Sequence, residues 1–230
     1  MDSIESRFLQ IRRTIADKAA ECQRSPEDVR IIAVSKTQSV QAVQKAINAG
    51  VEALGENYIQ EAVQKIEELR EKPVSWHFIG HLQSNKAKYA VRHFDMIHTV
   101  DRIKLAREID KQAGKINKTQ DILIQVNIAK EDTKSGTDAD NAIALAKEIG
   151  QMEHLSLKGL MCMPPFFDDP ERARPYFRKL KELKNFINSK DLPGVSLTHL
   201  SMGMSGDYKV AIEEGATMVR IGTNIFGSRN

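Results

Sequence analysis

The stretch Ile122-Leu123-Ile124-Gln125-Val126 is an almost unbroken run of aliphatic and β-branched residues. A strand that is buried on both faces has this composition, because neither face meets water. Such strands are typical of parallel sheets that are covered by helices on their outer side. The run therefore predicts an interior strand of an α/β protein, and the segments on either side of it decide the architecture.

Short apolar runs alternate with longer helical patterns along the rest of the chain. The other seven strands are expected at residues 29–34, 53–54, 76–79, 96–100, 157–161, 197–200 and 218–221. Helices are expected at 40–48, 58–70, 84–91, 104–112, 139–149, 170–188 and 207–214, after an amphipathic N-terminal helix at about 3–24. This alternation predicts βα units in a parallel sheet.

Eight βα units within 230 residues favour a compact TIM-type (β/α)8 barrel of the α/β class with an extra N-terminal helix. We expect residues 1–230 to form one barrel domain, on which residues 1–28 pack as a helix and linker. The alternative is an open doubly wound sheet. A nucleotide-binding version of that fold needs G-x-G-x-x-G after its first strand, where this chain has Ser35-Lys36-Thr37-Gln38.

Composition limits the partners and the compartment. The excess of 34 basic over 31 acidic residues is small and dispersed, which does not favour nucleic acid. No apolar run has the length of a membrane span, which is about 18 residues, and acidic residues near Met1 do not fit a signal peptide. Cys22 and Cys162 have neither CxxC spacing nor further thiols. We therefore expect a cytoplasmic protein without disulfides or membrane association, and Cys162 is better explained as a small hydrophobic residue than as a nucleophile.

Lys36 follows the apolar run Ile31 to Ser35, so its amine begins in a partly buried position. Desolvation disfavours the ammonium form and lowers the pKa of such an amine. A neutral amine is a nucleophile that can form a Schiff base with a carbonyl compound or with pyridoxal phosphate. The alternative is that Lys36 ends the strand and extends its ammonium group into water.

Polar residues follow most of the other expected strands too, and in a barrel these strand ends meet on one face. They include Gly55-Glu56-Asn57, His77 near Gly80, Ser201, Arg220 and Gly222-Thr223. Unpaired polar groups at the ends of buried strands are costly, so we expect them to bond to each other or to a ligand. His77 and His81 leave the strand without a helical glutamate between them, so a catalytic metal is not expected.

The loops after the last two strands have the composition of a phosphate site. Glycines 203, 206 and 222 let the backbone approach a ligand, and Ser201 and Thr223 add hydroxyl groups. Barrels commonly hold phosphate in these two loops. The glycines could also serve only as turns. Arg220 at the end of its strand must find an acceptor, for which a pyridine nitrogen or the carboxylate of Glu56 would serve.

Six blocks of sequence carry a resemblance to a known family. They are Ala33 to Thr37, Gly55 to Tyr58, Trp76 to Gly80, Leu82 to Lys86, Leu200 to Ser205 and Val219 to Thr223. Together, in this order, they resemble the YggS-type pyridoxal phosphate homeostasis proteins over about residues 30–229. That family has a single barrel similar to the N-terminal domain of alanine racemase, which places it among fold type III pyridoxal phosphate proteins.

The resemblance implies that the cofactor is pyridoxal 5'-phosphate, bound covalently as a Schiff base on Lys36. It further implies that Arg220 meets the pyridine nitrogen, that Ser201, Gly222 and Thr223 bind the phosphate, and that Asn57 lies beside the ring. His77 is placed near the cofactor by strand order, although it could equally be structural. The expected cofactor-binding residues are therefore Lys36, Asn57, His77, Ser201, Met202, Arg220, Gly222 and Thr223.

We expect a protein that holds pyridoxal phosphate and delivers it to apo-enzymes, as part of intracellular cofactor homeostasis, rather than an efficient catalyst. A racemase needs a second acid/base group opposite Lys36, and the related racemase takes it from a further domain for which the sequence, ending at Asn230, shows no counterpart. Tyr58 and Tyr208 lie near strand ends but begin helices. The alternatives are a pyridoxal-phosphate-dependent amino-acid racemase and a Schiff-base aldolase. A closed barrel has no open edge, so a monomer is expected.

Overall fold

The computed structural model describes residues 3–129 and 135–227, and it shows a closed barrel of eight parallel strands in sequential order. The strands are β1 (Arg30–Val34), β2 (Ala53–Glu56), β3 (Ser75–Phe78), β4 (Met96–Val100), β5 (Gln120–Gln125), β6 (Leu155–Met161), β7 (His199–Met204) and β8 (Met218–Ile221). Pairing of β1 with β8 closes the ring, in register from Arg30 opposite Met218 to Ala33 opposite Ile221. The expected (β/α)8 barrel is confirmed, and the open sheet is wrong.

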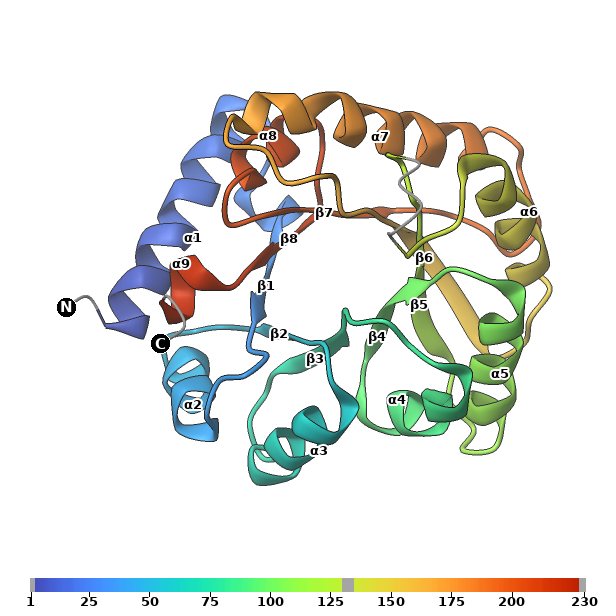
Figure 1. The fold of residues 1–230 in the computed structure, drawn as a ribbon, viewed down its shortest axis with the longest axis horizontal. Helices are drawn as coiled ribbons and strands as arrows, with labels where there is room; N and C mark the ends of the chain where they lie inside the picture. The colour runs from blue at the N-terminus through green and yellow to red at the C-terminus, as the bar shows by residue number, and fades with distance from the viewer. Residues whose placement is uncertain (1–2, 130–134, 228–230) are drawn as a thin grey trace.

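Helices form an outer ring around these strands (Figure 1). They are α2 (Val40–Asn48), α3 (Ile59–Glu68), α4 (Ala87–His93), α5 (Ile103–Gly114), α6 (Ala139–Ile149), α7 (Arg174–Asn188), α8 (Tyr208–Glu213) and α9 (Thr223–Phe226). Short 3-10 turns precede β1, α4 and α7 at Pro26–Asp28, Ser84–Lys86 and Pro170–Ala173. No helix among residues 3–129 and 135–227 combines the length and the apolar character that a bilayer crossing requires.

The helix α7 illustrates how the sequence pattern positions the outer ring. Its buried residues Phe177, Leu180, Leu183 and Ile187 recur every three or four positions, which places them on one face of an α-helix. That face packs against β6 and β7, while residues such as Lys179 on the other face are exposed. Burying each large apolar side chain contributes about 1.5–3 kcal/mol.

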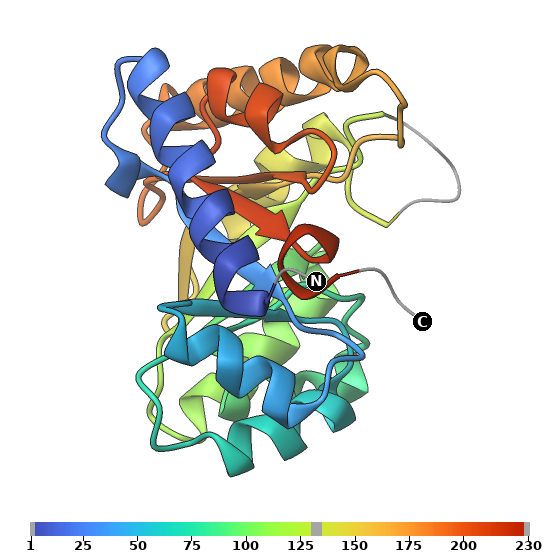
Figure 2. The same cartoon turned by 90° about the vertical axis from the view of Figure 1, so that its left-hand side faces the viewer.

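The N-terminal helix α1 (Ile4–Glu21) lies outside the barrel and packs against α2, α8 and α9. Figure 2 shows it alongside the last βα unit. Ser3 caps the helix by accepting a hydrogen bond from the Ser6 N–H, and Phe8, Ile11 and Ile15 are buried beneath it. The helix therefore packs against the first and last βα units, which contain Lys36 and Arg220.

The barrel has two apolar layers. The larger lies between the strands and the helices. The smaller lies inside the ring and consists of Ile32, Ala53, Met96, Leu123, Met161 and Met218. Inward-facing residues of a small barrel fill its interior and leave no pore. Buried polar side chains, among them His98 and Ser201, also lie in this interior, below the carboxyl ends of the strands.

Strand β7 differs from the expected pattern in a way that changes the site. We expected it to end at Leu200 and to be followed by a glycine loop, but it continues to Met204. Gly203 lies in this strand with a φ of 90°, and a Cβ atom there would come within 2.5 Å of the Ala211 Cβ. The glycine therefore permits close packing of α8 on β7. The short helix α9, at Thr223–Phe226, was not expected from the sequence.

Candidate functional site

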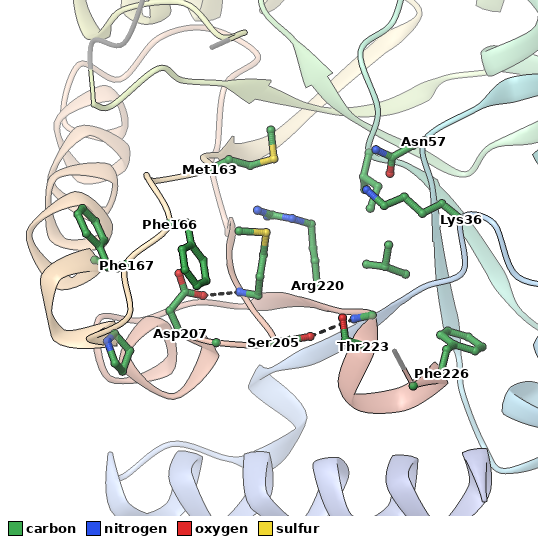
Figure 3. Close-up of a pocket in the computed structure, with 18 of the residues that line it drawn as sticks. Lys36, Asn57, Met163, Phe166, Phe167, Ser205, Asp207, Arg220, Thr223 and Phe226 are labelled. Atoms are coloured by element: carbon green, nitrogen blue, oxygen red, sulfur yellow. Dashed lines mark hydrogen bonds between the residues drawn. The ribbon is translucent and has the colours of Figure 1, made fainter. Parts of the chain in front are cut away.

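A cavity of about 300 Å3 lies at the carboxyl ends of the strands. Its walls come from the ends of β1, β2 and β3, from the segment after β6, and from the β7–α8 and β8–α9 connections. Figure 3 shows Lys36 and Asn57 on one side, Arg220 between them and Asp207, and Thr223 and Phe226 below. The cavity brings together five of the eight expected site residues: Lys36, Asn57, Arg220, Gly222 and Thr223.

Lys36 is half-buried and lies two residues after the end of β1. Its side chain extends into the cavity towards Asn57 (Figure 3). The backbone on both sides of it is fixed. The Ser35 N–H donates to the Gly55 carbonyl at 3.0 Å, and Thr37, with a φ of 64°, donates its N–H to Glu61. A β-branched residue rarely adopts such a φ, so this turn is strained beside the lysine.

A buried ionic cluster, which we call the Lys65 cluster, consists of Lys65, Glu56, Glu61 and Ser35. The ammonium group of Lys65 lies 2.7 Å from the Glu56 carboxylate and 2.6 Å from that of Glu61, and it donates to the Ser35 carbonyl at 2.7 Å. The Ser35 hydroxyl also donates to Glu56. Burial raises the pKa of Glu56, while the hydrogen bonds from Lys65 and Ser35 act against it. Through Ser35 and Glu61 the cluster holds both neighbours of Lys36.

Asn57 follows β2, and its backbone is covered by Gly80. A Cβ atom at position 80 would come within 2.2 Å of the Asn57 carbonyl oxygen, so only glycine fits this contact. The Asn57 Oδ1 atom is buried and has no hydrogen-bond partner among the described residues. A buried acceptor without a partner is costly. Because Asn57 lines the cavity, this atom is suited to accept a hydrogen bond from a bound molecule.

Arg220 is 3% exposed and stands on β8 with its side chain at the floor of the cavity. It donates to the Ser201 hydroxyl at 2.7 Å and to the Cys162 carbonyl at 2.8 Å. Both acceptors are neutral. Burial lowers the pKa of the guanidinium group, yet an arginine keeps its proton in proteins. The expected alternative, an ion pair with Glu56, is not formed, because Glu56 binds Lys65.

The β7–α8 and β8–α9 connections form the wall that was expected to bind phosphate. Gly222 donates its N–H to the Ser205 hydroxyl at 3.4 Å, and the Asn224 amide donates to the Ser205 carbonyl at 3.1 Å. The two connections are therefore joined to each other. Thr223 is exposed at the cavity. Nearby, Asp207 accepts the Met204 N–H at 2.6 Å, and burial raises the pKa of its carboxyl group.

Three expected site residues lie outside the cavity wall: His77, Ser201 and Met202. All three are buried, with exposed fractions of 1% or less. His77 and Ser201 point into the barrel interior, where both contact His98. Ser201 belongs to β7 and not to the loop after it, so its hydroxyl bonds to Arg220 from below. The cofactor contacts expected for these three residues stay predictions.

Several cavity residues were not expected from the sequence. Ser205 follows β7 and lines the cavity, where we had expected the hydroxyl of Ser201. Met163, Phe166 and Phe167 form an apolar wall after β6, and Phe166 is 83% exposed. The long segment between β6 and α7, which begins at a strand end, was the signal that could have pointed to them. Cys162 is fully buried, and burial raises the pKa of its thiol to about 12, as expected for an unreactive hydrophobic residue.

Comparison with known proteins gives consistent results. Residues 12–230 match the family described as "Alanine racemase, N-terminal domain". The chain is 42% identical over 223 residues to the pyridoxal phosphate homeostasis protein of Aquifex aeolicus, covering 97% of each chain. It is 40% identical to the protein of that name from Escherichia coli K12, covering 100% of this chain and 98% of the relative.

Solved structures agree. The structure of PipY from Synechococcus elongatus with PLP bound has a TM-score of 0.82 and 36% sequence identity, covering 93% of this chain and 100% of that chain. Alanine racemase of Clostridium difficile has a TM-score of 0.69 and 16% identity, covering 95% of this chain and 56% of that one. The second similarity concerns the fold alone.

Proposed function

The chain belongs to the alanine racemase N-terminal domain family and to its pyridoxal phosphate homeostasis proteins, and we propose that it binds pyridoxal 5'-phosphate as a Schiff base on Lys36. The observation that carries the proposal is that a single cavity contains a half-buried lysine at one strand end and a buried arginine on another. The sequence similarity to PipY, a protein solved with PLP bound, supports the same cofactor.

The described residues fit the cofactor. The amine of Lys36 would form the covalent link, and Asn57 Oδ1, a buried acceptor without a partner among them, would accept a hydrogen bond from the ring hydroxyl. Arg220 would donate to the ring nitrogen, because its other contacts are to neutral acceptors. Gly222, Thr223 and Ser205 would bind the phosphate. The cofactor supplies the carbonyl carbon, and an arginine at the ring nitrogen keeps that nitrogen unprotonated.

The lining of the cavity favours holding the cofactor over racemisation. Racemisation needs two acid/base groups on opposite faces of the reacting carbon. Among the described residues that line the cavity, the titratable side chains are Lys36, Asp207 and Arg220. Asp207 is engaged by the Met204 N–H, and Arg220 keeps its proton. Tyr58 is largely exposed and Tyr208 is buried outside the cavity. We therefore infer a role in pyridoxal phosphate homeostasis, with delivery to apo-enzymes.

We propose further that the protein is a cytoplasmic monomer. Both cysteines are free thiols, which fits a reducing compartment. The barrel is closed between β1 and β8, so it needs no partner to cover a sheet edge. Phe166, which lines the cavity, is largely exposed, and an exposed wall suits release of the cofactor to another protein.

An absorption spectrum of the purified protein tests the proposal. The wild-type protein with added pyridoxal phosphate should be yellow, and borohydride reduction followed by peptide mass mapping should place the adduct on Lys36. Lys36→Ala should lose the adduct and exchange the cofactor faster. Lys179→Ala, which removes an exposed lysine from the outer face of α7, is the matched control and should behave as wild type. A colourless wild-type protein would overturn the proposal.

Two further measurements separate delivery from catalysis. Incubation of the loaded protein with an apo form of a pyridoxal-phosphate-dependent enzyme should restore the activity of that enzyme. Amino acids incubated with the loaded protein in D2O should not be converted to the opposite enantiomer, with deuterium at the α-carbon, at an enzymatic rate, because inversion needs a second acid/base group opposite Lys36. Rapid deuterium incorporation with inversion would favour the racemase instead.

A further inference from the structure

A continuous line of polar side chains runs through the barrel interior beneath Arg220. We call it the interior chain, and it consists of Arg220, Ser201, His98, His77, Ser75 and Asp95. Successive contacts measure 2.7 Å from Arg220 to the Ser201 hydroxyl and 3.0 Å from that hydroxyl to His98 Nδ1. They continue with 2.8 Å from His98 Nε2 to His77 Nδ1, 3.1 Å from His77 Nε2 to Ser75, and 3.3 Å from Ser75 to Asp95.

The interior chain joins two opposite faces of the barrel. Arg220 lines the cavity at the carboxyl ends of the strands. Ser75 begins β3 and Asp95 immediately precedes β4, so both lie at the opposite face, where Asp95 is exposed. His77 and His98 are 1% and 0% exposed. The interior chain thus links the buried guanidinium group of Arg220, under the cavity, to the solvated carboxylate of Asp95 at the opposite face of the barrel.

In the part of the interior chain next to the cavity, the donor and the acceptor of each hydrogen bond can be assigned. A guanidinium group can only donate, so Ser201 accepts from Arg220. The one other partner of the Ser201 hydroxyl among the described residues is His98 Nδ1. If the hydroxyl donates to this atom, then Nδ1 carries no proton. A neutral imidazole has one N–H, so the proton of His98 must lie on Nε2.

The lower half continues in the same direction. The Nε2–H of His98 donates to His77 Nδ1, which places the proton of His77 on its own Nε2. The Nε2–H of His77 then donates a hydrogen bond to the Ser75 hydroxyl, and the Ser75 hydroxyl donates to the Asp95 carboxylate. With the opposite direction, the buried Ser201 proton would have no acceptor among the described residues, and Asp95 would lose its bond from Ser75. Only the first direction uses every proton, which buried polar groups require.

We propose that His98 and His77, both as neutral imidazoles protonated on Nε2, are positioning residues that hold the Arg220 guanidinium in the orientation in which it meets the ring nitrogen of pyridoxal phosphate. The ligand part of this inference rests on the proposed function. Burial lowers the pKa of both histidines, that of His77 to about 3, which keeps them neutral. A second positive charge next to Arg220 is thereby avoided.

The tautomers can be measured on the full chain without any ligand. Nitrogen-15 NMR of the imidazole groups at neutral pH distinguishes a protonated Nε2 from a protonated Nδ1. We expect Nε2–H for both His98 and His77. A protonated Nδ1 on His98 would overturn the proposal, because the hydroxyl of Ser201 would then have no acceptor in the interior chain.

Ligand affinity tests the positioning role with variants of His98. His98→Leu removes the acceptor for Ser201 and should weaken pyridoxal phosphate binding roughly tenfold and shift the absorption of the bound cofactor. His98→Asn keeps an amide oxygen close to the position of Nδ1 and should retain most of the affinity. His93→Leu, on α4 outside the barrel, is the control and should match wild type.

Other outcomes decide between the two proposals. Equal affinity and an unchanged spectrum in His98→Leu would overturn the positioning role, and so would an equal loss in His98→Asn and His98→Leu. A wild-type protein that binds no pyridoxal phosphate but shows the expected tautomers would refute the proposed function. The ligand part of this inference would fall with it, and the interior chain itself would stand.

Discussion

The Lys65 cluster and the interior chain are two buried polar networks next to the same cavity, and they treat a buried cation in opposite ways. Lys65 has two carboxylates within 2.7 Å. Arg220 is as deeply buried, but its described acceptors, a serine hydroxyl and a backbone carbonyl, are neutral. A cation whose charge is already balanced by two carboxylates interacts only weakly with a ligand. The comparison suggests that the first network supports the backbone of the site, while the second keeps a charged donor available.

Lys65→Met should have the largest effect and tests the supporting role. It leaves Glu56 buried without its cation, which typically costs about 3–5 kcal/mol, and urea unfolding would measure the loss. The double variant Lys65→Met/Glu56→Gln is the matched control. It should recover much of the stability, since no buried carboxylate is then left unpaired at position 56. A double variant no more stable than Lys65→Met would break the comparison.

Arg220→Met should show the reverse pattern. It removes a charge whose hydrogen-bond acceptors among the described residues are neutral, so the free energy of unfolding should change by less than about 2 kcal/mol, because lost hydrogen bonds and a relieved desolvation cost oppose each other. Pyridoxal phosphate affinity should fall by about 2 kcal/mol, roughly 30-fold, since a hydrogen bond from a charged donor is lost. Spectrophotometric titration measures the affinity. A loss of stability as large as in Lys65→Met, with affinity intact, would assign Arg220 to structure.

Mild acid should affect the interior chain through its histidines. Their pKa values are lowered by burial, to about 3 for His77, whereas the unfolded chain binds protons from about pH 6.5 downwards. The unfolded state therefore gains protons first, and stability is complete above pH 6.5 and falls as the pH decreases. The loss should be about 1.5 kcal/mol for His77 between pH 6.5 and pH 5, and His98 should add to it in the same direction.

His77→Gln tests this pH dependence directly. His93, whose pKa is also lowered, contributes equally to both proteins, so the difference between the two slopes belongs to His77 together with His98 and His199, which interact with it. Unfolding free energies at pH 5, 5.5, 6 and 6.5 would supply the slopes. Equal slopes would show that His77 is not held neutral by the fold.

The smallest effect is expected for an ion pair at the surface. Arg107 and Glu148 join α5 to α6 at 2.9 Å, with side chains 67% and 48% exposed. Arg107→Ala should change the unfolding free energy by less than about 0.5 kcal/mol, because exposed pairs are screened by water. The result would show that the effect at Lys65 comes from burial and not from the presence of an ion pair. A loss near that of Lys65→Met would remove this distinction.

The elements of the fold were predictable because they depend on local patterns. The helices Val40–Asn48 and Ala139–Ile149 and the strands Met96–Val100 and Met218–Ile221 have the bounds expected from periodicity. Strand β7 was placed too early. Its Ser-Met-Gly-Met end has the composition of a loop, but Gly203 is required there by the contact with Ala211. That contact belongs to the packing of α8 and leaves no signal in the strand itself.

The sequence by itself determined the alternation of strands and helices, the closure expected of eight βα units, and the positions of Lys36, Asn57, Arg220, Gly222 and Thr223 at strand ends. These follow from side-chain periodicity and from the common direction of parallel strands. Only the tertiary structure decided which polar groups bond to each other. His98 and Ser201 are 103 residues apart, and Lys65 binds Glu56 and not the solvent. Such contacts depend on which side chains of distant elements reach the same depth, either inside the barrel or between its strands and helices, and local sequence does not specify that depth.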